Sequence, residues 1–337
     1  MKSLHRKLVP CLSVALLIFC GSWGFLMHRT ITQLSVYQLP KEMQPFFAQN
    51  MASVVRNAVR PDERRNSDPT EASKHFIDLE MYGKNAANKM PMDWDDAVAK
   101  YSKDTLLKYG YVPYWVITMK DRLTNAFRKG DRDSILFYAT DLAHYVEDAN
   151  VPLHTSVNYD GQLTNQKGLH SLWESTVPEL MIQGFDLEGQ KKAKYLKHPA
   201  KEIWKAVRRA AKLVSDVVNI EREVSLGFAD STKYRIQMRS GREVKSYSTA
   251  FARAYGARIQ GAVNEQTKHA ANLVADFWYT AWVDAGKPDL SGLMSKKWEA
   301  ADAEKLSNEM KAYRENGLLK SGWLLSKKSA GNEAESN

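Results

Sequence analysis

The chain has 337 residues, of which 44% are hydrophobic and 26% are charged, and its formal net charge is +9. This is the composition of a globular protein, and it excludes an intrinsically disordered chain and a collagen-like or low-complexity repeat. The sequence has one long apolar run, at its N-terminus, so it is not a polytopic membrane protein.

The segment 1–22 has the three parts of a secretory signal peptide. Basic residues precede the apolar run 8–20, and small residues follow it. A membrane span needs roughly 20 apolar residues, so a signal anchor is the weaker alternative. We therefore expect cleavage before Trp23 and a secreted or periplasmic protein.

Removal of residues 1–22 changes the chemistry that is available. Both cysteines, Cys11 and Cys20, lie in that segment, which also carries three basic residues and no acidic one. The remaining 315 residues therefore have a formal charge of +6 and no thiol. Any metal site in them must consist of histidines, carboxylates and backbone groups.

Apolar residues recur with helical periodicity along most of the remaining chain, and alternating, strand-like patterns are scarce. Asp131 or Asp133 is placed to cap the helix that leads to His144. No linker divides the chain, so we predict one all-α domain over 23–315, followed by a tail, 316–337, that is disordered at its end. The windows expected to form helices are 44–59, 92–104, 113–129, 131–149, 170–182, 199–224, 244–286 and 298–315.

The stretch 190–213 is strongly basic. Two interpretations stay open for it. It forms the solvated face of a helix, or it contacts an anionic polymer or a membrane surface.

Histidines and carboxylates recur together at helical spacing. The pairs are His75–Asp78, His144–Asp148 and His170–Glu174. Residues three or four apart lie on the same face of a helix. His154 follows Pro152, which is expected to end the helix that carries His144. A single such pair is common on protein surfaces, but several pairs on facing helices are typical of a multi-metal core. Imidazole and carboxylate ligands together suit zinc.

In this order, these residues resemble the ligand motifs of the zinc-dependent phospholipase C/S1–P1 nuclease superfamily, over roughly residues 23–285. The resemblance implies a secreted, all-α domain of that type, with a trinuclear zinc cluster between its helices. It implies that Trp23 binds zinc through a free amino group and its carbonyl oxygen, and that Asp148 bridges two ions. The three implied ligand sets are Trp23, His28 and Asp148; Asp62, His75, His144 and Asp148; and His154, His170 and Glu174.

The resemblance also implies the roles of residues around the ions. It implies hydrolysis of a phosphodiester bond by a metal-activated water, which Asp78 orients or deprotonates. Arg65 matches a residue that contacts phosphate. Phe76 is an aromatic candidate for substrate binding, either by stacking on a base or by lining a lipid pocket.

The substrate class stays open between a phospholipid and a single-stranded nucleic acid. The start WGFLMH and Trp173 resemble the nucleases, whereas Glu174 and the short segment between His154 and His170 resemble the phospholipases. The alternative is a secreted helical protein whose zinc ions are purely structural and which has no hydrolase activity. The sequence implies no protein partner, and we expect a monomer.

Overall fold

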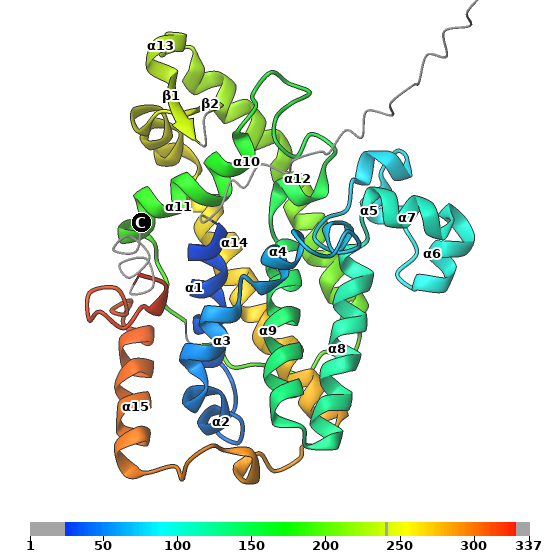
Figure 1. Cartoon of the computed structure of the whole chain (residues 1–337), viewed down its shortest axis with the longest axis vertical. Helices are drawn as coiled ribbons and strands as arrows, with labels where there is room; N and C mark the ends of the chain where they lie inside the picture. The colour runs from blue at the N-terminus through cyan, green and yellow to red at the C-terminus, as the bar shows by residue number, and fades with distance from the viewer. Residues whose placement is uncertain (1–23, 190, 240–241, 328–337) are drawn as a thin grey trace, which may run out of the picture.

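The computed structural model describes residues 24–189, 191–239 and 242–327 (Figure 1). The predicted signal peptide, Trp23 and the end of the predicted tail lie outside this part. The α-helices are α1 Gly24–Val36, α2 Gln44–Gln49, α3 Met51–Asn57, α4 Arg60–Arg64, α5 Ala86–Lys89, α6 Trp94–Tyr101, α7 Lys103–Tyr109, α8 Val112–Lys129, α9 Arg132–Asp148, α10 Leu169–Ser171, α11 Val177–Met181, α12 Pro199–Ser225, α13 Asp230–Lys233, α14 Thr249–Asp284 and α15 Ala300–Arg314.

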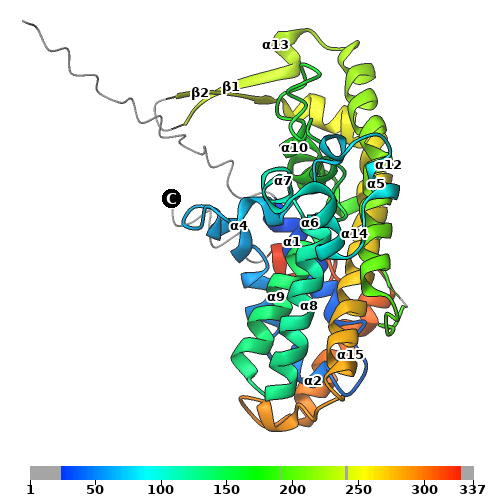
Figure 2. The same ribbon diagram turned by 90° about the vertical axis from the view of Figure 1, so that its right-hand side faces the viewer.

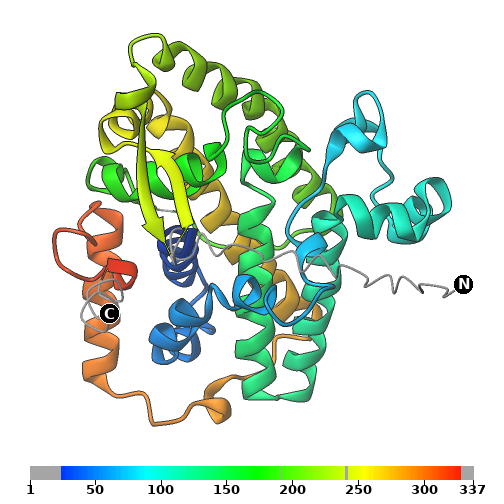
Figure 3. The same cartoon turned by 45° about the horizontal axis from the view of Figure 1, so that its top comes forward.

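Helices dominate the described chain, so the predicted all-α class is confirmed. The described strands, β1 (Tyr234–Arg239) and β2 (Arg242–Tyr247), form one antiparallel hairpin. Figure 2 shows this hairpin standing out from the helices near one end of the molecule, and in Figure 3 it lies in front of them. The short helical segments are η1 Ala72–Lys74, η2 Leu79–Tyr82, η3 Pro152–Thr155, the π-helical η4 Leu172–Thr176, η5 Ile182–Gly184 and η6 Ser291–Leu293.

The helix α14 forms the centre of the core. It packs against α1, α8, α9, α11 and α12. Its side chains Phe251, Phe277 and Trp278 are completely buried, and Nε1 of Trp278 donates a hydrogen bond to the carbonyl of Ala139 on α9 (2.8 Å). Each such buried aromatic side chain stabilises the fold by about 1.5–3 kcal/mol. The helices that surround α14 are thereby held at fixed positions.

The helices α8 and α9 lie side by side and are joined by a short turn. Gly130 follows α8 in the left-handed region, with φ of +62°. Asp131 then accepts a hydrogen bond from the backbone N–H of Ser134 (3.2 Å), so Asp131 is the residue that caps α9. From Ala139 to Asp148 this helix is buried. Its last two turns therefore lie inside the molecule.

The segment 316–327 returns to α1 after α15. Gln33 donates a hydrogen bond from Nε2 to the carbonyl of Trp323 (2.8 Å), and its Oε1 accepts one from the N–H of Leu325 (2.9 Å). The hydroxyl groups of Thr30 and Ser326 lie 2.8 Å apart. These contacts fix the side of α1 that faces the segment 316–327.

Differences between the structure and the predicted windows include the following three. The helix α1 is buried along nearly its whole length, so it lacks the amphipathic pattern that predicts a surface helix. The window 44–59 divides at Asn50. The window 244–286 begins in β2, and α14 starts only after Ser248, whose Oγ accepts a hydrogen bond from the N–H of Phe251 (3.2 Å). Among the described residues, no helix has the length and apolar character that a membrane span requires.

Candidate metal centre

Eight of the nine predicted metal ligands lie in the described chain, and the structure brings these eight together. They form three groups, and within each group one ligand atom from every residue lies within 4.8 Å of the others. Trp23, the ninth, lies outside the described residues. The eight positions are His28 on α1, Asp62 on α4, His75 after η1, His144 and Asp148 on α9, His154 on η3, His170 on α10 and Glu174 on η4.

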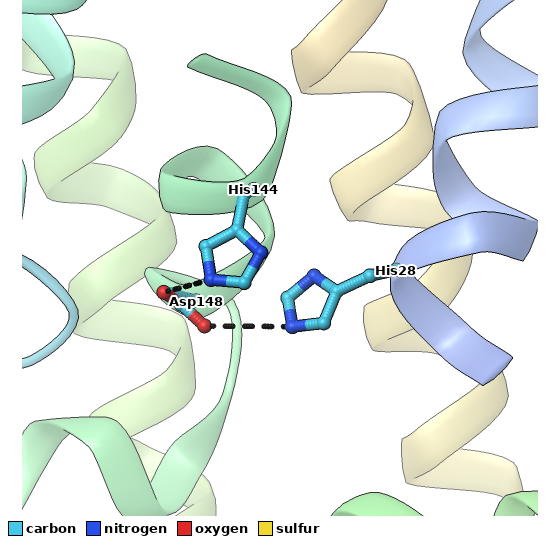
Figure 4. Close-up of side chains that lie close together, drawn as sticks. All are labelled: His28, His144 and Asp148. Carbon is cyan, nitrogen blue, oxygen red and sulfur yellow. Dashed lines mark ion pairs between the residues drawn. The ribbon is translucent and has the colours of Figure 1, made fainter. Parts of the chain in front are cut away.

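The first group joins α1 to α9. Figure 4 shows His28 pointing from α1 toward His144 and Asp148 on α9. Nε2 of His28 lies 3.7 Å from Oδ1 of Asp148, and Nε2 of His144 lies 3.3 Å from Oδ2 of the same carboxylate. The two imidazole rings are stacked, with their centroids 4.1 Å apart.

The second group lies on the other side of the Asp148 carboxylate. Oδ1 of Asp62 lies 3.6 Å from Nδ1 of His75 and 3.7 Å from Nε2 of His144. Oδ2 of Asp148 lies 2.9 Å from Nδ1 of His75. Oδ1 of Asp148 therefore faces His28, and Oδ2 faces His75 and His144, which is the arrangement that a bridging carboxylate needs.

The third group is more open to solvent. Nε2 of His170 lies 2.6 Å from Oε2 of Glu174, and Nε2 of His154 lies 3.7 Å from the same oxygen. Glu174 belongs to the π-helical segment η4, a distortion that is common at functional sites. The side chain of His170 is 30% exposed, whereas those of His28 and His144 are at most 4% exposed. A solute can therefore reach the cluster from the side of His170.

Four of the five histidines are oriented by a hydrogen bond at one ring nitrogen, and the fifth, His75, has a carboxylate beside it. A protein that holds one nitrogen in this way leaves the other with a lone pair for a metal. For these four the oriented nitrogen is Nδ1, whereas Nε2 of His75 makes no hydrogen bond to the described residues and lies 3.4 Å from Oε1 of Glu71. The partners of the four are Glu147 for His28, the carbonyl of Ala58 for His144 (2.8 Å), the carbonyl of His75 for His154 (2.9 Å) and the carbonyl of Tyr159 for His170 (3.1 Å).

Burial and neighbouring charges set the pKa values in the cluster. Burial lowers the pKa of His28, but the hydrogen bond to Glu147 and the charges of Glu147, Asp148 and Asp62 together outweigh it and raise this pKa to about 10. Burial and the charge of His28 lower the pKa of His144 to about 4. Burial opposes ionisation of Asp148, yet the surrounding histidines hold its pKa well below the usual range. The carboxylate is thus ionised, as a metal ligand must be.

One buried oxygen of the cluster is available to a cation. Oδ2 of Asp148 is buried and makes no hydrogen bond within the described chain. A buried, unsatisfied carboxylate oxygen costs several kcal/mol. A metal ion would satisfy it, because the imidazole nitrogens and carboxylate oxygens around it are the donors that zinc prefers. The residues present therefore fit zinc.

The three other predicted site residues lie beside the groups. Asp78 follows His75 by three residues and is half-buried; burial, and then the charge of Glu80, raise its pKa to about 6. Nη1 of Arg65 lies 3.6 Å from Oδ1 of Asp62, at the exposed edge of the second group. Phe76 is partly exposed, and its carbonyl accepts a hydrogen bond from the N–H of Val112 (3.1 Å). The structure does not include Asp78 in any of the three groups.

Two carboxylates in the site were not predicted. Glu147 also accepts a hydrogen bond from Oγ1 of Thr32 (3.0 Å) and is 2% exposed. Glu71 is 1% exposed and accepts hydrogen bonds from Tyr145, from Lys74 (2.8 Å) and from Arg64. Glu71 precedes His75 by four residues, and this helical spacing was a signal from which its contact with His75 could have been predicted. Nothing in the sequence near Glu147 indicates His28, which lies 119 residues away.

The first described residue lies against the cluster. A Cβ atom placed on Gly24 would be 2.7 Å from Oε1 of Glu174, which is closer than real Cβ contacts. Nε2 of His28, four residues later on α1, lies 3.8 Å from the same oxygen. Glycine at position 24 therefore allows the start of α1 to approach the third group.

Comparisons with known proteins give a weak structural likeness. No family model matches the sequence, and no curated protein matches it. The alpha-toxin of Clostridium absonum aligns with a TM-score of 0.45 and 14% identity, over 80% of this chain and 66% of the toxin. The alpha-toxin of an avian strain of Clostridium perfringens aligns with a TM-score of 0.44 and 12% identity, over 80% of this chain and 65% of the toxin. The match thus spans just under two thirds of each toxin chain, and it assigns no activity to this one.

Proposed function

We propose that this chain is a secreted, zinc-dependent hydrolase of phosphodiester bonds, of the zinc-dependent phospholipase C/S1–P1 nuclease type that its sequence resembles. The observation that carries the proposal is the convergence of oriented histidines on Asp148. Four of the five histidines are held by a hydrogen bond at Nδ1, and the three groups of donors lie close together around Asp148. Such ordered ligands match a site that is built to hold metal ions.

The third group favours catalysis over a purely structural role. Structural zinc sites have four protein ligands, whereas catalytic sites have three and keep one position open. The described chain supplies three donors here, from His154, His170 and Glu174. Bound zinc supplies a Lewis acid for a phosphoryl oxygen and makes water more acidic.

The residues around the ions have separate roles in the proposal. Asp148 holds two groups at a fixed spacing through its two oxygens. Arg65, at the exposed edge, binds a non-bridging oxygen of the phosphate. Asp78 accepts a proton from the attacking water, and a pKa of about 6 suits a base at neutral pH.

We also propose that cleavage before Trp23 completes the first group. That group contributes donors from His28 and Asp148, because the one available nitrogen of His144 also faces Asp62 of the second group. Gly24, the residue after Trp23, lies beside Glu174, which supports a position of the new amino terminus near the ions. A free α-amino group is a good metal ligand once it has lost its proton.

A paired assay tests the proposal. The zinc-loaded protein that begins at Trp23 is incubated with a water-soluble phosphodiester, bis(p-nitrophenyl) phosphate, with and without a chelator. Separate samples receive single-stranded RNA and phosphatidylcholine. We expect chelator-sensitive release of nitrophenol, and release of nucleotides or of phosphocholine then gives the substrate class. Zinc binding without hydrolysis of any of the three would favour the structural-zinc alternative.

A further inference from the structure

The β1–β2 hairpin exposes two large apolar side chains. Side chains alternate along a strand, so Tyr234, Ile236 and Met238 lie on the same face of β1. Ile236 and Met238 are each 66% exposed, and among the large apolar side chains of the described chain only Leu226 is more exposed. Met238 lies four residues beyond Tyr234, or roughly 13 Å further along the strand. The apolar pair thus projects beyond the base of the hairpin.

The base of the hairpin is fixed to the domain. Tyr247, opposite Tyr234, is 4% exposed and stacks on Phe251 of α14 (centroids 4.9 Å apart). Its Oη lies 2.9 Å from Oε1 of Glu221 on α12, and Nζ of Lys233 lies 2.7 Å from the same oxygen. The exposed apolar pair is therefore carried on an anchored element.

The hairpin is also connected to the loop that leads to His170. Oη of Tyr247 lies 3.2 Å from the carbonyl of Gln166. The ring of Tyr247 is 3.5 Å from the position of a Cβ atom on Gly168. In Figure 2 the hairpin extends toward the same side of the molecule as α4, the helix of Asp62. A surface that binds the hairpin would lie near the open side of the metal centre.

The charges of the hairpin complement an anionic surface. Residues 234–247 include four basic residues and one acidic residue. Lys245, opposite Ile236, lies with Nζ 3.8 Å from the ring centroid of Tyr234. The acidic residue, Glu243, lies opposite Met238, but the hairpin as a whole carries a net positive charge. Aliphatic side chains on such an element suit the boundary of an anionic bilayer, where the side chains enter the acyl region and the cations meet phosphate groups. Single-stranded nucleic acid is instead bound by stacking on aromatic rings, and Ile236 and Met238 have none.

We propose that the β1–β2 hairpin docks this protein on an anionic phospholipid bilayer by inserting Ile236 and Met238. This inference rests on the proposed function in one respect, the class of substrate. A hairpin docked on the bilayer, beside the solvent-exposed third group, presents phospholipids to the metal centre. Lys245, which lies opposite Ile236 on the same face of the hairpin, contacts the lipid phosphates.

Vesicle sedimentation tests the docking directly. The zinc-loaded protein is mixed with vesicles of phosphatidylcholine and phosphatidylglycerol at 7:3, and the bound fraction is measured. We expect the double variant Ile236→Ser/Met238→Ser to bind about tenfold or more weakly, because two apolar side chains no longer enter the bilayer. The matched control is Met92→Ser/Leu107→Ser, which changes two exposed apolar residues elsewhere (41% and 40%) and is expected to bind as the parent does. Lys245→Glu is expected to weaken binding to these vesicles, but not to vesicles of phosphatidylcholine alone.

The outcomes separate this inference from the proposed function. Hydrolysis of bis(p-nitrophenyl) phosphate reports on the metal centre alone, and the hairpin variants are expected to keep it unchanged. Docking is refuted if the parent does not bind the vesicles, or if the double variant binds them equally well while this hydrolysis persists. Docking is also refuted if the double variant loses binding to single-stranded DNA, or loses self-association, but keeps vesicle binding. Absence of hydrolysis in the parent, with hairpin-dependent vesicle binding, would instead overturn the proposed function.

Discussion

Glu147 on α9 accepts a hydrogen bond from Nδ1 of His28 on α1. Because Nδ1 is held in this way, Nε2 faces Asp148 at 3.7 Å. The carboxylate of Glu147 is itself held by a hydrogen bond from Oγ1 of Thr32 (3.0 Å). A single buried side chain thus sets both the ring orientation of His28 and the contact between the two helices.

The substitution Glu147→Gln tests this relationship. Glutamine keeps the size of the side chain but removes its charge, so His28 is held less firmly. We expect the affinity of the protein for its most weakly bound zinc ion to fall about 10–100-fold. Competition with a chromophoric chelator measures this affinity. Asp276→Asn is the matched control, because Asp276 is also a buried carboxylate (4% exposed) but bonds the backbone of Lys194. Equal affinities in Glu147→Gln and the parent would show that Glu147 has no part in metal binding.

A second buried carboxylate, Glu71, is expected to affect stability as well. It accepts hydrogen bonds from Tyr145, Lys74 and Arg64 and faces His75. Glu71→Gln removes one charged partner of Lys74 and of Arg64, which keep Asp68 and Asp141 beside them, and we expect a loss of about 1.5–3 kcal/mol of unfolding free energy. Urea unfolding of the zinc-free protein measures this loss without a contribution from metal binding. A change of less than about 1 kcal/mol would contradict the assigned network.

The sequence predicted the ligands that share a helix and missed the groups that orient them. His144 and Asp148 are four residues apart, so their proximity follows from helix geometry. Glu147 and His28 meet only because α1 packs on α9, and no local pattern encodes that packing. The predicted all-α class is confirmed, but the hairpin was missed because its alternation extends over only a few residues on each strand.

The close approach of Gly24 to Glu174 gives a third prediction. In Gly24→Ala the added Cβ atom would lie 2.7 Å from Oε1, so the carboxylate must move away from its position in the third group. We expect kcat for bis(p-nitrophenyl) phosphate to fall about tenfold or more, since small displacements at a reacting centre are costly. Gly261→Ala is the control, because no atom lies within 4 Å of a Cβ atom there. If both variants retain the parent kcat, Glu174 is not held in place for catalysis.

The pH dependence of the reaction tests the role of Asp78. Burial, and then Glu80, raise the pKa of Asp78 to about 6. The carboxylate, which is the proton acceptor, is present above this pH, so kcat/KM should rise with pH through about 6. Asp78→Asn should remove this rise and lower the plateau about 10²–10⁴-fold. The pKa of Asp78 in the folded protein exceeds its ordinary value of 3.8. Ionisation of Asp78 therefore also lowers the free energy of unfolding as the pH rises from 3.8 to about 6.

The variant Glu80→Gln separates Asp78 from a metal-activated water, which also titrates near neutral pH. Removal of the Glu80 charge should lower the pKa of Asp78 and move the rise in kcat/KM to lower pH. A pH profile that does not move would assign the rise to another group.

Anomalous diffraction at the zinc absorption edge, from crystals of the zinc-loaded protein that begins at Trp23, tests the central claim most directly. The account predicts three zinc peaks: one between His28 and Asp148, one among Asp62, His75 and His144, and one among His154, His170 and Glu174. Zinc peaks confined to other parts of the protein, or no peak at these three groups, would contradict the claim that the histidines and carboxylates form a zinc cluster.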